Sequence, residues 1–178
     1  DQIDLRYTVI EVSFAEPAPG TTFDMVFAPA QTTQSAFIAQ VAALQVQGRK
    51  VLLGIGGANA TVQLNSDAER DQFVQSILGL LGTYGFDGID IDLEGASVNI
   101  TGGTIATPVD ASIIRLIDAV LFIGDAFEAQ YGVPMMLTMA PETAFVQGGQ
   151  SRWVTVPEAA AGAAYVPVRQ VIDEGADE

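Results

Sequence analysis

The sequence predicts an α/β fold in which a mainly parallel sheet is covered by helices. Strand-like and helix-like segments alternate along the chain in four successive units. The strand-like segments are apolar on both faces or nearly so, which is typical of parallel strands buried beneath helices. A doubly wound sheet and a (β/α)8 barrel both fit this pattern. A complete barrel usually takes about 250 residues, whereas this chain has 178.

Each element has its own local signal. Runs of aliphatic, aromatic and β-branched residues predict strands over 7–14, 50–55, 86–93 and 133–139. Apolar residues at helical spacing, or a proline that suits a helix start, predict helices over 34–47, 66–85, from 108 onward and over 157–173. Ser66 stands three residues before Glu69, as in a capping box. Thr107 is the expected cap of the helix that Pro108 opens.

Composition excludes several classes of site and partner. The chain has no cysteine and no histidine, which excludes disulfides, thiolate or histidine metal sites, and Ser-His-Asp or Cys-His catalysis. The net charge of −15 disfavours nucleic acid and anionic membranes, but it suits a neutral polysaccharide. No apolar run reaches the roughly 18 residues that a membrane helix needs. We therefore expect no nucleic-acid and no membrane partner.

One predicted strand carries a column of acidic residues. Asp90, Asp92 and Glu94 alternate with apolar residues, so they share one face of the strand while the apolar residues share the other. Burial of several like charges is unfavourable, and we expect at least one of these acids to keep its proton near neutral pH. A protonated carboxylic acid beside an ionised one can act as a general acid on a glycosidic oxygen.

Three other interpretations of this acidic column remain open. Clustered carboxylates suit Ca²⁺ or Mg²⁺, although one strand face offers a line of oxygens instead of the cage such ions require. The acids would also be explained by a solvent-exposed edge strand, which the flanking aliphatic residues disfavour. An inactive relative of an enzyme would keep the same pattern without the activity.

At these residues the sequence resembles glycoside hydrolase family 18, the chitinase family. The family signature D-x-x-D-x-D-x-E, at the end of the fourth barrel strand, is complete as Asp87, Asp90, Asp92 and Glu94. Three further segments resemble the family's second, third and fifth strands: residues 9–17, 50–57 and 137–142. The resemblance extends over most of the chain and implies a (β/α)8 TIM barrel with its active site at the carboxyl ends of the strands.

The resemblance also implies a mechanism. A chitin or chitooligosaccharide substrate is hydrolysed with retention of configuration, without a metal or organic cofactor, and the substrate's own N-acetyl group attacks the anomeric carbon. Glu94 is then the proton donor and afterwards the base that activates water. Asp92 orients the N-acetyl group, and Asp90 supports Asp92 and shares its proton.

Several further residues are expected near the site. Asp87 has a supporting role as part of the signature, and Gly56 and Gly57 let the backbone turn tightly at the end of a strand. Contacts with the sugar are expected from four residues: Phe14, Met139, Glu142 and Trp153. Core packing is an equally good interpretation of Met139 and Trp153, and a solvated loop position is an alternative for Glu142.

The sequence departs from the family pattern in two residues and in extent. Gly54 stands where the family usually has a serine. Glu11 stands where related chitinases often have asparagine, so we expect an extra acid to disturb nearby pKa values. Residues 1–178 match the second to fifth βα units, without recognisable first or sixth to eighth strands. We therefore expect one catalytic-domain segment of a partial barrel. Its exposed sheet edges, 7–14 and 133–139, would pair in a homodimer unless the chain belongs to a longer enzyme.

Two rival functions share the same fold. A chitin-binding, lectin-like relative would typically lack the terminal acid of the signature, but Glu94 is present. An endo-β-N-acetylglucosaminidase acting on glycoproteins would use the same catalytic residues. A nucleotide-binding domain is disfavoured because the glycines that end at Gly57 do not open a phosphate-cradling helix. We expect a secreted, extracellular protein.

Overall fold

The fold is a mainly parallel sheet with helices packed against it, as predicted. The computed structural model describes residues 3–4, 6–98, 101 and 107–140. Along this part the elements are β1 (Val9–Pro17), β2 (Met25–Val26), α1 (Gln34–Val46), β3 (Lys50–Gly56), α2 (Asp67–Tyr84), β4 (Gly88–Asp92), the 3₁₀ helix η1 (Gly95–Ser97), α3 (Ala111–Tyr131) and β5 (Met136–Met139). The helix predicted over 157–173 lies outside the described residues.

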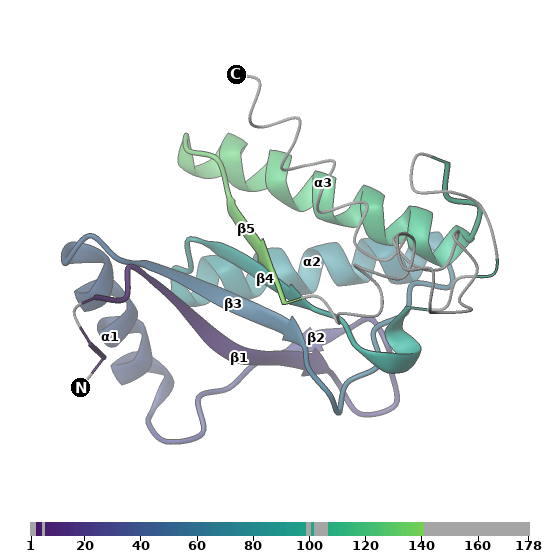
Figure 1. The fold of residues 1–178 in the computed structure, drawn as a ribbon. Coiled ribbons are helices and arrows are strands. Elements are labelled where there is room, and N and C mark those ends of the chain that lie inside the picture. Colours follow the sequence, from purple (N-terminus) through teal and green to yellow (C-terminus); the bar gives the residue numbers. More distant parts are fainter. Residues whose placement is uncertain (1–2, 5, 99–100, 102–106, 141–178) are drawn as a thin grey trace, which may run out of the picture.

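The described strands form one sheet in the order β2-β1-β3-β4-β5 (Figure 1). The four longer strands run parallel, and each step from β1 to β3, β4 and β5 passes through one α-helix. Strand β2 was not predicted, because it has only two residues. It pairs antiparallel with Glu16 and Pro17 at the end of β1. In the described part of the chain, β2 thus covers only the last residues of one edge, and β5 forms the other edge.

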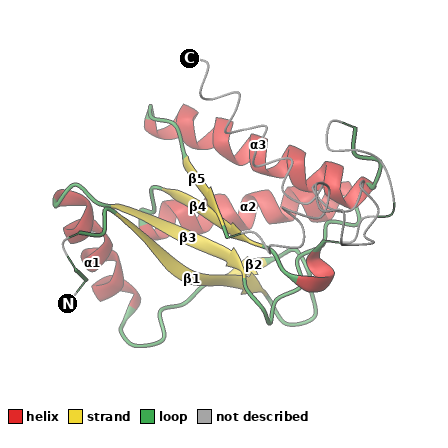
Figure 2. Ribbon diagram, in the orientation of Figure 1, coloured by secondary structure: helices red, strands yellow, loops and turns green. Residues whose placement is uncertain are grey.

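The hydrophobic core lies between the sheet and the helices. Helices α2 and α3 lie side by side against the sheet (Figure 2). Leu53 of β3 and Ile89 of β4 point to the same side and are fully buried, and they belong to one cluster with Phe73 and Ile77 of α2 and Ile123 of α3. The apolar residues that alternate with the acids of β4 therefore anchor that strand beneath the helices.

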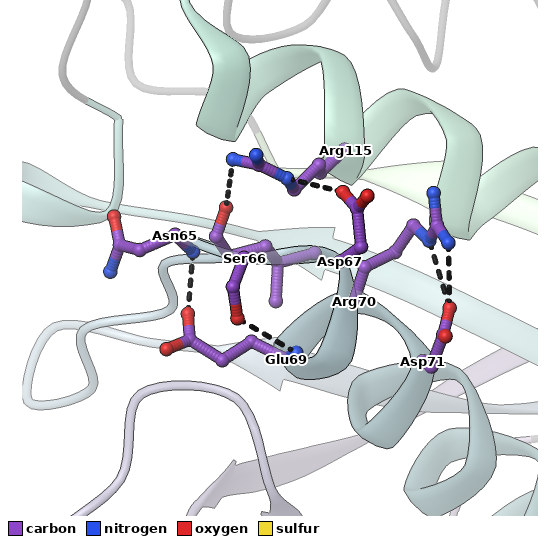
Figure 3. A network of polar contacts seen from close by, with 8 residues as sticks. Asn65, Ser66, Asp67, Glu69, Arg70, Asp71 and Arg115 are labelled. Atoms are coloured by element: carbon purple, nitrogen blue, oxygen red, sulfur yellow. Dashed lines mark hydrogen bonds and ion pairs between the residues drawn. The ribbon is translucent and has the colours of Figure 1, made fainter.

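The start of α2 confirms the predicted cap and also joins α2 to α3 (Figure 3). The Ser66 Oγ accepts a hydrogen bond from the Glu69 backbone amide at 3.2 Å, and the Glu69 carboxylate accepts one from the Asn65 backbone amide. The Arg115 Nε of α3 donates to Asp67 Oδ1 at 2.8 Å. Because α2 follows β3 and α3 follows β4, this contact fixes two consecutive βα units against each other.

Helix α3 begins later than predicted. Its N-cap is Asp110, whose backbone oxygen accepts hydrogen bonds from the amides of Ile113 and Ile114, both at 3.0 Å. Thr107 is therefore not the cap, and Pro108 precedes the helix instead of occupying its first turn. Within the described ranges, no helix combines the length and the apolarity needed to cross a bilayer.

Candidate active site

The acidic column of β4 lies on the sheet face opposite the helix-packed core. Asp90 pairs with Gly54 of β3 and with Thr138 of β5, and Asp92 pairs with Gly56. Paired residues of neighbouring parallel strands point to the same side of the sheet. We call this side, which carries Asp90, Asp92 and Thr138, the acidic face.

Asp90 is the most enclosed acid of this face. Only 3% of the residue is exposed, and the Thr138 hydroxyl donates a hydrogen bond to its Oδ1 at 2.7 Å. Burial raises the pKa of Asp90, and the neighbouring Asp92 charge raises it further, while the Thr138 hydrogen bond opposes both effects. Asp90 therefore holds a proton more readily than an ordinary aspartate does.

Asp92 and Glu94 follow toward the carboxyl end of the strand, and both are half-buried. Glu94 stands two residues beyond β4 and directly before η1. The loop after Glu94 is held by Ser97, whose Oγ accepts from the Val62 amide at 3.0 Å and donates to the Ala60 oxygen at 3.2 Å. The position of Glu94 is thus set on one side by β4 and on the other by the loop that follows β3.

Gly56 and Gly57 bring the backbone after β3 against Asp92. The Gly57 amide donates to the Asp92 backbone oxygen at 2.7 Å. A Cβ on Gly56 would lie only 2.3 Å from that same oxygen, and Gly56 has a φ of +107°. Only glycine fits such a close approach in this conformation. The structure therefore brings both predicted glycines to the carboxyl end of the acidic face.

Phe14 reaches the acidic face through an irregularity in β1. The register with β3 shifts between Val12 and Ala15, so Ser13 and Phe14 together stand opposite Gly54; a cis peptide bond joins them. Such a bulge redirects a side chain. A Cβ on Gly54 would lie 3.0 Å from the Phe14 ring. At the position where the family usually has a serine, this chain therefore has a glycine with the Phe14 ring packed over it.

Asp87 does not join the other acids of the signature. It precedes β4 at the amino end, where it accepts hydrogen bonds from Lys50 Nζ at 2.8 Å and from Gln45 Nε2 and the Val51 amide, both at 2.9 Å. Burial alone would raise the pKa of Asp87, but these three donors together lower it below its ordinary value. The hydrogen bonds of Asp87 hold the start of β4 against β3 and α1.

The remaining predicted contacts fall elsewhere. Met139 pairs with Ile91, on the opposite side of the strands from Asp90, and packs against the hydrophobic core. Its placement therefore favours core packing over a contact with substrate. Glu142 and Trp153 lie outside the described residues. Across the described ranges, no group of three or more acidic side chains is arranged to hold a metal ion.

Two residues join the acidic face beyond those chosen from the sequence as site residues. Thr138 was not chosen, although its place one residue before Met139 in a predicted strand offered a signal. Glu11 was noted only as an extra acid. Glu11 stays exposed on β1. Partial loss of its hydration, and then the charges of Asp90 and Asp92, raise its pKa, while Thr138 opposes them. The expected disturbance of pKa values thus falls on Glu11 itself.

Comparison with known proteins agrees with this geometry. A sequence model of a family described as glycosyl hydrolases family 18 matches residues 6–166. The chain belongs to glycosyl hydrolase family 18. Chitinase Chi52 from Paenibacillus xylanexedens is 42% identical over 149 residues, and Chitinase D from Niallia circulans is 41% identical over 150 residues. Each of these matches covers 83% of this chain and 28% of the relative.

A solved family 18 structure shows the same arrangement. The crystal structure of a family GH18 chitinase from Chromobacterium violaceum superposes with a TM-score of 0.74 at 36% identity, over 95% of this chain and 41% of that one. The described strands and helices thus correspond to part of a family 18 fold, in agreement with the partial (β/α)8 barrel predicted. The chain spans less than half the length of each of these three proteins.

Proposed function

We propose that this family 18 protein hydrolyses β-1,4-linked N-acetylglucosamine polymers such as chitin. The observation that carries the proposal is the order of acids toward the carboxyl end of β4. Buried Asp90 and half-buried Asp92 lie on the acidic face, and half-buried Glu94 follows two residues beyond the end of β4. Carboxyl ends of barrel strands are where enzymes of this architecture place their chemistry.

In this proposal each acid has a separate role. Glu94, the outermost of the three, protonates the glycosidic oxygen and later removes a proton from the attacking water. Asp92 holds the amide of the substrate's N-acetyl group while its carbonyl oxygen attacks the anomeric carbon and displaces the leaving sugar. Asp90, whose pKa is raised by burial, accepts and returns the proton that Asp92 exchanges.

The surroundings of the acids support a neutral sugar as the substrate. The Phe14 ring lies over Gly54 and Gly57, with its carbon atoms 2.9 to 3.0 Å from where their Cβ atoms would be. It brings an apolar surface to the acidic face, and such surfaces suit the apolar side of a pyranose ring. The net charge of −15 would repel a polyanion but leaves an uncharged polymer unaffected.

We further propose that the protein acts outside the cell, because an insoluble polymer is reached there.

We also propose a homodimer. The edges of the described sheet at β1 and β5 carry backbone groups that pairing in a homodimer would satisfy. Light scattering during size-exclusion chromatography tests the dimer. A monomer mass at all concentrations would contradict it.

The direct test of hydrolysis is release of the fluorophore from a fluorogenic di-N-acetylchitobioside. The wild-type chain is compared with Glu94→Gln and with Glu128→Gln, which changes an exposed glutamate on α3. Activity that is lost only in Glu94→Gln supports the proposal. Equal activity in all three would contradict it.

The rival functions give different outcomes in the same assays. A lectin-like protein would bind chitin beads in a pull-down while releasing no fluorophore. An endo-β-N-acetylglucosaminidase would release glycans from a glycoprotein faster than it cleaves the chitobioside. Circular dichroism of each variant confirms that loss of activity does not come from unfolding.

A further inference from the structure

Asp90 lies between two neighbours of different chemistry in the sheet. Its partner on β3 is Gly54, which has no side chain, and its partner on β5 is Thr138. The Phe14 ring, which carries no hydrogen-bond donor, lies against the place where a side chain at Gly54 would begin. The side-chain donor to Asp90 therefore comes from the β5 side, and the Thr138 Oγ1 lies 2.7 Å from Asp90 Oδ1.

The backbone of β5 holds Thr138 in this place. The amides of Met136 and Ala140, on either side of Thr138, donate to backbone oxygens directly before β4 and within it, both at 3.0 Å. A β-branched side chain on a strand also has few accessible rotamers. The direction of the Thr138 hydroxyl is thus set by the register of two strands, and the hydroxyl stays beside the Asp90 carboxyl.

The charges near Asp90 oppose its ionisation. Burial raises the pKa of Asp90 most, the charge of Asp92 raises it further, and the Thr138 hydrogen bond lowers it. Glu11 of β1 is a third acid near this face, but its side chain stays exposed. The Lys50 ammonium of β3 is bound at the amino end of β4. The Thr138 hydroxyl is therefore the group that favours a carboxylate at position 90.

The hydrogen bond also distinguishes the two oxygens of the Asp90 carboxyl. A carboxylic acid carries its proton on one oxygen, and the other oxygen only accepts. The Thr138 hydroxyl donates to Oδ1, so a proton on that same oxygen would face the hydroxyl proton. Protonation of Asp90 is thereby directed to Oδ2.

We propose that Thr138 is a positioning residue of the active site, whose hydroxyl holds Oδ1 of Asp90 and directs the exchangeable proton to Oδ2. The catalytic consequence rests on the hydrolase function proposed above; the effect on Asp90 does not. In the exchange the O–H bond at Asp90 Oδ2 breaks as an O–H bond forms on Asp92, and the reverse transfer restores the first state. Without the Thr138 hydroxyl, Asp90 keeps its proton more tightly and the transfer to Asp92 is slower.

Carboxyl ¹³C NMR titration of the whole chain tests the effect on Asp90 without turnover. In Thr138→Val, which keeps the shape of the side chain, the pKa of Asp90 should be higher than in the wild type, because a donor to the ionised form is gone. Thr138→Ala should shift the pKa in the same direction, and Thr138→Ser should return it toward the wild-type value.

Tyr84→Phe is the matched control for the loss of one hydroxyl. The Tyr84 hydroxyl donates to the Phe27 backbone oxygen at 3.1 Å, and Tyr84 belongs to the core on the helix side of the sheet. This variant should leave the Asp90 titration curve unchanged. An Asp90 curve that is the same in the wild type, Thr138→Val and Thr138→Ala would overturn the proposal. A shift that is equally large in Thr138→Ser would also overturn it, since that variant keeps the hydroxyl.

Hydrolysis of the fluorogenic chitobioside gives the second readout. Thr138→Val should lower kcat about 10-fold through the lost hydrogen bond and leave KM within about two-fold, because Thr138 does not bind the sugar. Thr138→Ser should recover most of kcat, and Tyr84→Phe should retain it. An unchanged kcat in Thr138→Val would overturn the positioning role. A shifted Asp90 curve without turnover in any variant, the wild type included, would support the effect of Thr138 on Asp90 and contradict the hydrolase function instead.

Discussion

Asp87 directly precedes β4 and Asp90 lies within it, three residues further on, and the two acids have different surroundings. The Asp87 side chain is 15% exposed and accepts hydrogen bonds from an ammonium, an amide side chain and a backbone amide. Asp90 is 3% exposed, the Thr138 hydroxyl donates a hydrogen bond to it, and the charge of Asp92 acts on it. As a result the pKa of Asp87 is lowered and that of Asp90 is raised.

This difference separates structure from chemistry within one signature motif. An acid whose charge is fully matched by donors stabilises the fold in its ionised form. A buried acid beside a like charge destabilises the folded state when ionised, and such groups are characteristic of functional sites. We infer that the amino end of β4 holds the strand in place while its carboxyl end supplies the reactive carboxyls.

The largest effect is expected from Glu94→Gln compared with Asp87→Asn. Loss of a proton donor should lower kcat by about 10²- to 10⁴-fold, because glutamine cannot donate a proton to the leaving oxygen. Asp87→Asn should leave kcat of the folded molecules within a few-fold, since Asp87 lies away from the other acids. Chitobioside hydrolysis measures both. A larger loss of kcat in Asp87→Asn than in Glu94→Gln would contradict the structural role of Asp87.

The second-largest effect is expected on the stability of the fold, from a glycine substitution at the carboxyl end of the acidic face. In Gly56→Ala the new Cβ would lie 2.3 Å from the Asp92 oxygen at a φ of +107°, which should destabilise the fold by about 1–3 kcal/mol. Gly124→Ala is the matched control, because a Cβ added at Gly124 in α3 would meet no atom within 4 Å beyond its own helix backbone and chain neighbours. That variant should gain about 0.5–1 kcal/mol. Chemical denaturation measures both, and similar values would contradict the close approach.

Asp87→Asn should lower the free energy of unfolding by about 1–3 kcal/mol, because charged hydrogen bonds to three donors are weakened. Lys50→Met removes only the ammonium partner, which is largely exposed, and should have an effect of about 0–1 kcal/mol. Urea denaturation at neutral pH distinguishes the two. An equal loss in both variants would mean that the ion pair, and not the enclosed hydrogen bonds, accounts for the stability.

The smallest effects concern pH. Because the pKa of Asp87 is lowered, its stabilisation is present above the ordinary aspartate value of 3.8 and is lost as the pH falls through the folded-state pKa. The pKa of Asp90 is raised, so its contribution is present below 3.8 and is lost as the pH rises through its folded-state pKa. The free energy of unfolding should therefore change less with pH in Asp87→Asn than in the wild type across the acid range, as measured by urea unfolding at a series of pH values. A slope equal to that of the wild type would contradict the assignment.

Periodicity predicted much of this arrangement from the sequence. Alternation along β4 placed Asp90 and Asp92 on one face and the aliphatic residues on the other, and both faces are observed. The cap at Ser66 followed from local hydrogen bonding, which needs no tertiary information. The two glycines after β3 marked the point where the backbone closes on Asp92.

Features that depend on pairing between strands could not be predicted from the sequence. The bulge that directs Phe14 onto Gly54 depends on the register of β1 with β3. Thr138 became a partner of Asp90 only once β5 was aligned with β4. Asp87 was assigned to the site by its place in the motif, but its donors come from α1 and β3, and only the folded chain brings them together.

The sign of the stability change in Asp87→Asn and Asp90→Asn tests the division of β4 most directly. Each substitution replaces one carboxyl group by an amide, directly before β4 in one case and within it in the other. Urea unfolding at neutral pH reports the free energy of unfolding of each variant. Asp87→Asn should be less stable than the wild type, and Asp90→Asn should be more stable, because the cost of ionising a buried acid beside Asp92 is removed. A loss of stability of similar size in both variants would contradict the division into a structural end and a reactive end.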